Sequence, residues 1–233
     1  MPKRMAAGKR PSRPGESVAR ALHNQLRQGV LRGMWRPGHT LVEHKVAHAY
    51  GVSRGPAREA LKLLEREGLL TAIPRRGYVV SMITVRQIRE LFDLRLILER
   101  EAAARAARTA TPEDVARLEA LVGDPYLLGD QESYARFLSQ NRAFHVAIAR
   151  LTRNDRIAAL VEALLEELER LFHLGLDVRD RAETLVSEHK ELVDAIRAHD
   201  PKRAMRVAAA QIENAQTMVL EGVTQGLLPA AVP

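Results

Sequence analysis

One stretch decides the fold of the first part of this chain: Gly51-Val-Ser-Arg-Gly-Pro-Ala-Arg-Glu-Ala-Leu-Lys-Leu-Leu-Glu-Arg-Glu-Gly-Leu-Leu70. Ser53 is a good N-cap residue, because its hydroxyl can accept a hydrogen bond from a first-turn amide. Apolar residues then recur at helical spacing, while another face carries Arg54, Arg58 and Lys62 at i, i+4 and i+8. A tight turn before a helix with an apolar back and a cationic front predicts the second helix of a helix-turn-helix. An ordinary solvated charged face is the alternative.

Positive charge is concentrated in the same part of the chain. Residues 1–83 contain 16 Lys and Arg against 5 Asp and Glu, a net charge of +11, whereas residues 84–233 contain 20 against 24, a net charge of −4. This asymmetry predicts a polyanion-binding domain joined to a domain with another role. The absence of cysteine excludes disulfides and thiolate metal sites. Because neither a long apolar run nor a secretory signal is recognisable, we expect a cytoplasmic protein.

The elements expected around the opening stretch complete a winged helix-turn-helix over residues 16–82. Residues 1–15 are expected to form a basic, disordered arm, and helices are expected over about 16–31 and 41–50. Beyond residue 70, two β-prone runs flank Arg75-Arg76-Gly77, which predicts a hairpin with two arginines at its tip.

The sequence after residue 82 indicates a mainly α protein. Residues 83–224 are expected to form an all-helical bundle of six helices, and residues 225–233 are expected to be a tail. Helical periodicity and capping signals place the helices at about 85–110, 111–122, 131–151, 155–174, 182–198 and 200–222.

Polar side chains interrupt the apolar stripes of four of these helices. They are Arg95, Asn141, His145, His189 and Gln211. Any one of them alone is best explained as a satisfied core residue. Five polar residues pointing inward from four helices predict a shared polar cavity that holds water, an ion or a ligand, because a buried polar group without a partner costs free energy.

The first domain resembles the DNA-binding domain of the GntR family of bacterial transcription regulators. The matching residues are Gly33, Pro37-Gly38, Leu41, Glu43, Ala47, Gly51 to Arg54, Pro56, Arg58 to Leu61, Leu64-Glu65, Glu67 to Leu69 and Arg76-Gly77. The expected DNA-contacting residues are His44, Lys45, Ser53, Arg54, Arg58, Lys62, Arg75, Arg76 and Gly77. Arg54 and Arg58 can offer bidentate donors to guanine edges, and Ser53 with Lys62 can hold phosphates. The resemblance implies that His44 or Lys45 also faces DNA, and the wing tip would approach the minor groove.

The second domain resembles the FCD domain, the helical effector-binding domain of the FadR subfamily, in its smaller VanR-like variant. The resemblance rests on Phe144-His145, Asn154, Glu188-His189, Ala195-Ile196, Asp200, Ala204 and Met205. In many members an Asp and three His bind a divalent metal, and a small carboxylate completes the coordination. The corresponding positions here are Asn141, His145, His189 and Gln211. With two amides at these positions the site would be neutral, so we expect His145 and His189 to bind Zn or Ni weakly or not at all, with Asn141 and Gln211 as possible ligands.

These features predict a ligand-responsive transcription regulator, a repressor, that binds a palindromic DNA operator as a homodimer. A small carboxylate would enter the helical cavity, where Arg95 could take it as a fork. A regulator whose pocket is purely structural is the first alternative. The second is a metal-dependent enzyme using His145 and His189. It is disfavoured because no inward carboxylate is expected beside them to act as general base, a role Asn141 cannot fill.

Overall fold

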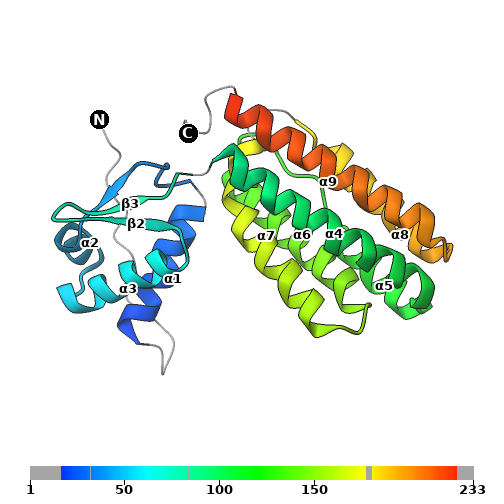
Figure 1. Ribbon diagram of the computed structural model, residues 1–233, viewed down its shortest axis with the longest axis horizontal. Coiled ribbons are helices and arrows are strands. Elements are labelled where there is room, and N and C mark those ends of the chain that lie inside the picture. The colour runs from blue at the N-terminus through cyan, green and yellow to red at the C-terminus, as the bar shows by residue number, and fades with distance from the viewer. Residues whose placement is uncertain (1–16, 32, 83, 177–179, 225–233) are drawn as a thin grey trace. The chain divides into compact units, whose positions relative to one another are not determined.

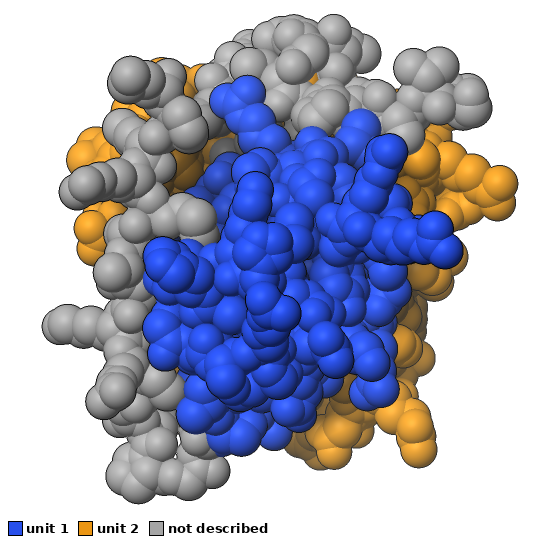
Figure 2. Space-filling view, turned by 90° about the vertical axis from the view of Figure 1, so that its left-hand side faces the viewer, with its two compact units in different colours: residues 1–83 blue, residues 84–233 orange. Residues whose placement is uncertain are grey.

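The computed structural model describes residues 17–31, 33–82, 84–176 and 180–224. The predicted arm over residues 1–15 and the tail over residues 225–233 lie outside these ranges. The chain forms two compact units, residues 1–83 and 84–233, which are coloured separately in Figure 2. Among the described residues, no helix is long and apolar enough to cross a membrane.

The first unit is a winged helix-turn-helix (Figure 1). Its elements are α1 (Val18–Leu31), β1 (Thr40–Leu41), α2 (Glu43–Tyr50), α3 (Arg54–Arg66), β2 (Leu70–Ile73) and β3 (Gly77–Val80). The three strands form an antiparallel sheet in the order β1-β3-β2. The apolar stripe of α3, made by Ala57, Ala60, Leu61 and Leu64, is fully buried in a core that includes residues of α1 and Trp35. Burial of this stripe holds the opposite, cationic face of α3 toward solvent.

Two local predictions in this unit are wrong. Leu41 lies in a strand and not in the second helix, because it pairs with Tyr78 of β3 and its backbone is satisfied there. The helix therefore begins at Glu43. Ser53 does occupy the N-cap of α3, with φ −76° and ψ 166°, but its hydroxyl makes no capping hydrogen bond. The usual donor at the third helical position is missing, since Pro56 has no N–H.

The second unit is an all-helical bundle, as predicted. Its described residues form α4 (Val85–Thr109), α5 (Pro112–Leu121), α6 (Gln131–Arg150), α7 (Asp155–Gly175), α8 (Ala182–Arg197) and α9 (Pro201–Thr224), with no strand. Thr84 and Thr111 each begin a helix with a capping box. The long helix α4 packs along α9, and α6 packs along α7 (Figure 1). Helices α4, α6, α8 and α9 supply the five inward polar residues.

Candidate functional site

A concave surface of about 450 Å³ in the first unit lies where α2, α3 and the β2–β3 turn meet. Five of the nine predicted DNA-contacting residues line it: His44, Arg54, Arg75, Arg76 and Gly77. The first four are exposed. The tertiary structure thus brings His44 and Gly77, which are 33 positions apart in the sequence, into one groove. Its three arginines are Arg54, Arg75 and Arg76. Lys45, Ser53, Arg58 and Lys62 are also exposed but do not line this groove.

Arg58 forms an ion pair with Glu43, which helical spacing alone does not predict. Its Nε donates to both carboxylate oxygens of Glu43 at 3.1 Å, and its Nη2 lies 3.0 Å from Glu43 Oε2. This ion pair joins α3 to the first turn of α2. Because the Arg58 side chain is 57% exposed, the pair contributes little stability and can be exchanged for another acceptor.

Gly77 has a packing role in the wing. Its φ of +99° is one that residues with a Cβ rarely adopt. A Cβ at this position would also lie 2.7 Å from the carbonyl oxygen of Leu41 in β1. Only glycine therefore allows β1 and β3 to pair here. A close approach of Gly77 to DNA remains a prediction.

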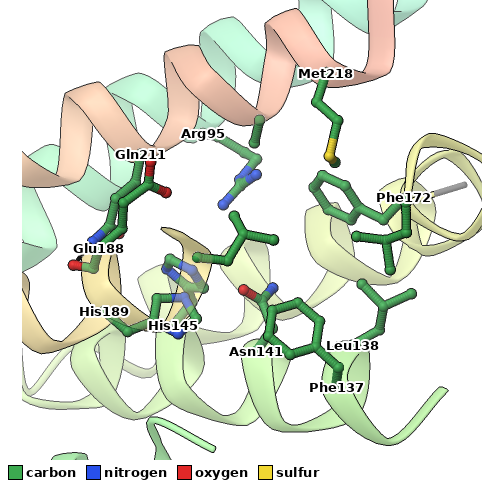
Figure 3. Close-up of a pocket in the computed structure, with 13 residues that line it drawn as sticks. Arg95, Phe137, Leu138, Asn141, His145, Phe172, Glu188, His189, Gln211 and Met218 are labelled. Carbon is green, nitrogen blue, oxygen red and sulfur yellow. Dashed lines mark hydrogen bonds between the residues drawn. The ribbon is translucent and has the colours of Figure 1, made fainter. Parts of the chain in front are cut away.

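The polar cavity of the second unit is small and is lined by residues of α4, α6, α7, α8 and α9. Its volume is about 30 Å³, which holds roughly two water molecules. All five predicted residues line it: Arg95, Asn141, His145, His189 and Gln211. Figure 3 shows Arg95 extending from its helix toward the histidines and Asn141, with Phe172 and Met218 at the other end. Asn141 is half-buried, and the other four are buried.

Glu99 is the residue that sequence reasoning missed. Its Oε1 accepts a hydrogen bond of 2.6 Å from Arg95 Nε, and its Oε2 lies 2.7 Å from His145 Nδ1. All three side chains are at most 7% exposed. The expectation that no carboxylate lies beside the histidines is therefore wrong. The i, i+4 spacing of Arg95 and Glu99 was the available signal.

The charge of Glu99 is fixed by its two partners. Burial raises the pKa of this carboxyl, but the positive charge of Arg95 and the contact with His145 outweigh burial and lower the pKa to about 2. Glu99 is therefore ionised near neutral pH, with both oxygens engaged. A carboxylate so strongly held is a poor general base, because a good one has a pKa near the working pH.

Within the part of the chain that the structure describes, three buried polar atoms around this cavity have no hydrogen-bond partner in the protein: Arg95 Nη1, His189 Nδ1 and Gln211 Oε1. Gln211 uses its other atom, Nε2, to donate to the backbone carbonyl of Glu188. Burial, and to a lesser extent the nearby His145, lowers the pKa of His189 to about 3, so its ring is neutral. Unsatisfied buried atoms cost free energy, and three beside one cavity indicate a place for a bound molecule.

The guanidinium of Arg95 places a positive charge in the cavity, which disfavours a divalent metal there. His145 Nδ1 is paired with Glu99, so only Nε2 of this ring could bind a metal. Within the described ranges, no group of three or more His, Cys, Asp or Glu side chains is arranged to hold a metal ion. Weak binding of a divalent metal through His145 and His189 stays a prediction.

The pKa values of His189 and Glu99 predict that acid destabilises the protein. Each pKa is lower in the folded state, from 6.5 to about 3 for His189 and from 4.5 to about 2 for Glu99. As the pH falls, the unfolded chain therefore takes up these protons before the folded chain does, and the free energy of unfolding decreases. The decrease begins near pH 6.5 and becomes steeper below pH 4.5. Each group contributes at most ~1.4 kcal/mol per pH unit. Urea unfolding with chelator at pH 7.5 to 4.5 measures the part of this loss that comes from His189.

His189→Gln is the control, because it removes one titrating group and leaves the other histidines in place. Between pH 6.5 and 4.5 its stability should fall less steeply than that of the wild type. Equal slopes for the two proteins would contradict the assignment of a neutral, buried His189.

Comparisons with known families agree with both units. The family "Bacterial regulatory proteins, gntR family" matches residues 18–80, and the FCD domain matches residues 90–214. The HTH-type transcriptional regulator YdhC of Bacillus subtilis (strain 168) is 26% identical over 193 residues, which are 82% of this chain and 86% of YdhC. The HTH-type transcriptional repressor RspR of Escherichia coli (strain K12) is 24% identical over 214 residues, 92% of this chain and 90% of RspR.

Solved structures show the same architecture. E. coli McbR/YncC has a TM-score of 0.68 and 25% identity, covering 88% of this chain and 98% of that chain. The crystal structure of a GntR transcriptional regulator from Rhodococcus sp. RHA1 has a TM-score of 0.68 and 26% sequence identity. This match covers 88% of this chain and 98% of that chain. These families and relatives are regulators and not enzymes, which removes the enzyme alternative. Each unit matches one of the two domains, and the FCD match alone spans more than half of the chain. The chain therefore belongs to the GntR family of DNA-binding transcription regulators and carries an FCD effector domain.

Proposed function

We propose that this regulator binds a palindromic operator as a homodimer and that a small molecule in the helical cavity changes its affinity for that operator. The observation that carries the proposal is the set of three unpartnered atoms, Arg95 Nη1, His189 Nδ1 and Gln211 Oε1, beside one cavity. A core that only supported the fold would gain stability from apolar residues at these positions. This argues against the alternative of a purely structural pocket.

The groove of the first unit supports the DNA-binding part of the proposal. Arg54 stands in the first turn of α3, where a recognition helix presents side chains to base edges in the major groove. Arg75 and Arg76 lie at the wing tip, within reach of the adjacent minor groove or phosphates. Ser53, Lys62 and Lys45 are exposed and can hold the backbone in register.

Exposed apolar side chains support dimerisation through the helical unit. Leu94 and Ile97 lie three residues apart on α4 and are 48% and 68% exposed. Such side chains are usually covered by a partner when they cluster. A second copy can cover them by presenting the same face, since two-fold interfaces are self-complementary. A two-fold dimer in turn requires a palindromic operator.

Coupling between ligand and DNA requires that the ligand bind two arrangements of the protein with different affinity. The cavity of about 30 Å³ leaves room for only a few atoms, so a larger effector would have to move the helices that line it. The role of repressor is proposed by analogy with RspR, whose name describes one. A small carboxylate, as the sequence predicts, would have Arg95 Nη1 as its donor.

Operator affinity should fall steeply with salt. Each phosphate neutralised contributes a slope of about −0.9 to log K against log salt concentration, so six contacts per dimer predict a slope near −5. Fluorescence anisotropy of a labelled operator, selected from random DNA, measures this slope between about 50 and 200 mM salt. Replacing Arg75 and Arg76 by Ala should flatten the slope. A slope near zero for the wild type would show that the groove is not a DNA surface.

Ligand response is tested with the same operator. A library of small polar metabolites is screened for thermal stabilisation of the full chain, and each hit is added to the operator complex. We expect at least one compound to shift both melting temperature and operator affinity, and Gln211→Leu to weaken both effects. A library in which no compound changes either quantity would favour the structural pocket.

A further inference from the structure

We infer that the helical cavity is built for a small neutral ligand that accepts a hydrogen bond from Arg95 and donates hydrogen bonds to His189 and Gln211. This inference rests on the proposed effector role of the cavity and specifies the chemical class of the effector. It differs from the carboxylate that the sequence predicts, because the structure shows carboxylates already in place.

Protein carboxylates balance the positive charge of the cavity. The charge of Arg95 is balanced by Glu99, whose Oε1 accepts a hydrogen bond of 2.6 Å from Arg95 Nε. A second carboxylate, Glu188, lines the cavity directly, and it pairs with Arg181 at 2.8 Å. Among the described residues that line the cavity, Arg95 is the only Lys or Arg, and its charge is balanced by Glu99. An anionic ligand would gain little from a guanidinium that already has a carboxylate partner, and it would lie near two carboxylates, Glu99 and Glu188, each of which is paired with an arginine.

The unpartnered atoms define what the ligand must present. Arg95 Nη1 is a donor, so it requires an acceptor. Gln211 Oε1 is an acceptor, because Nε2 of the same amide is used by the Glu188 carbonyl. His189 also hydrogen-bonds the backbone of Val122, and since Nδ1 has no partner this bond uses Nε2. The bond favours the protonated ring, as one donated to a carbonyl does, so Nδ1 of neutral His189 carries a lone pair.

One donor and two acceptors match a primary amide. Its carbonyl oxygen accepts from Arg95 Nη1, and the two hydrogens of its NH₂ group reach His189 Nδ1 and Gln211 Oε1. A carboxylate of the same shape has no hydrogen to donate, so it leaves both acceptors unsatisfied and faces them with negative charge. Hydroxylated neutral molecules supply the same pattern. The discriminating property is therefore hydrogen-bond donors without charge.

The remaining walls set the size and polarity of the rest of the ligand. Phe137, Leu138, Phe172 and Met218 line the cavity beyond the polar atoms, and Figure 3 shows Phe172 and Met218 together at that end. The Phe172 ring also lies 5.7 Å from the guanidinium carbon of Arg95, which helps to fix that side chain. A short apolar tail fits this end. Within about 30 Å³, a ligand of a few non-hydrogen atoms is the first choice.

Acetamide and acetate form a matched pair for the test, because they have the same shape and differ in charge and in hydrogen-bond donors. The full chain is melted with chelator at pH 7.5 over a concentration series of each compound, with sodium chloride as the ionic control for acetate. We expect acetamide to raise the melting temperature with a saturating, millimolar dependence. Acetate should give no increase beyond that of sodium chloride.

Two variants report on the reason for the preference. In Gln211→Leu one acceptor is lost, so acetamide should bind about tenfold more weakly, which is the effect of one hydrogen bond of typical strength. If acetamide acted only through the solvent, Gln211→Leu would not change its effect on the melting temperature. In Glu99→Gln the charge of Arg95 is no longer balanced, so the preference should reverse and acetate should stabilise more than acetamide. If Glu99→Gln does not fold, the comparison of the wild type with Gln211→Leu decides the question.

The outcomes separate the inference from the proposed function. Stabilisation of the wild type by acetate and not by acetamide would overturn the neutral ligand but keep the effector role. Stabilisation by neither compound would also overturn the inference, while a larger ligand found in the metabolite screen would keep the proposed function. An acetamide effect that Gln211→Leu does not weaken would place the ligand elsewhere and overturn the inference.

Discussion

Glu99→Ala is expected to lower the free energy of unfolding by about 3–5 kcal/mol, because it breaks a buried ion pair by removing one partner. The guanidinium of Arg95, whose side chain is 3% exposed, would lose its 2.6 Å acceptor, and His145 Nδ1 would lose its own partner at 2.7 Å. The remaining charge would stay buried. Urea unfolding at pH 7.5, followed by far-UV circular dichroism, measures the change.

Glu90→Ala is the matched control on the same helix. Arg86 and Glu90 have the same i, i+4 spacing and a similar distance, 2.8 Å, but their side chains are 87% and 56% exposed. Removing Glu90 should cost no more than about 0.5 kcal/mol. An equal cost for the two variants would show that Glu99 is not the buried counter-ion of Arg95. A double change, Arg95→Met with Glu99→Leu, should recover most of the stability, because an apolar pair leaves no buried charge.

Arg54→Ala is expected to weaken operator binding by about 1–3 kcal/mol for each winged head, or about 2–6 kcal/mol for a dimer on a symmetric operator. Arg54 is the recognition-helix arginine that lines the groove, and it is exposed. The loss should be largest on the selected operator and small on random DNA, because a base contact carries sequence information and a phosphate contact does not. Competition binding with both DNAs measures the two affinities.

Arg66→Ala provides the control for charge. Arg66 lies in the last turn of the same helix, is exposed, and does not line the groove. Its removal should weaken binding to both DNAs slightly and equally. Arg58→Ala should give an intermediate result, since Arg58 must leave Glu43 to contact a base. Equal losses of operator preference for Arg54→Ala and Arg66→Ala would refute the base contact assigned to Arg54.

Several features of the fold could be read from the sequence because they depend on neighbouring residues. The capping boxes that begin at Thr84 and Thr111 connect positions three residues apart, and the buried stripe of α3 follows helical spacing. The inward positions of Arg95, His145, His189 and Gln211 followed from the same periodicity. Each of these signals lies within one turn or one helix, so no knowledge of the tertiary structure was needed.

Other features depended on contacts between distant parts of the chain. Leu41 continues the helical pattern of the residues after it, but its pairing with Tyr78, 37 positions later, makes it a strand. The Arg58–Glu43 ion pair likewise requires the packing of α2 on α3. Periodicity describes one face of one element, and it does not identify which other element meets that face.

Glu99 shows the same division at the cavity. The sequence by itself determined that Arg95 and Glu99 are four residues apart on a helix, yet Arg86–Glu90 and Glu101–Arg105 on the same helix have that spacing and are exposed. Only the tertiary structure decided which pair is buried, because α6 brings His145 against Glu99 and neighbouring helices exclude water. The sequence placed polar residues around a cavity, and packing decided its charge, because the energy of an ion pair depends on its access to solvent.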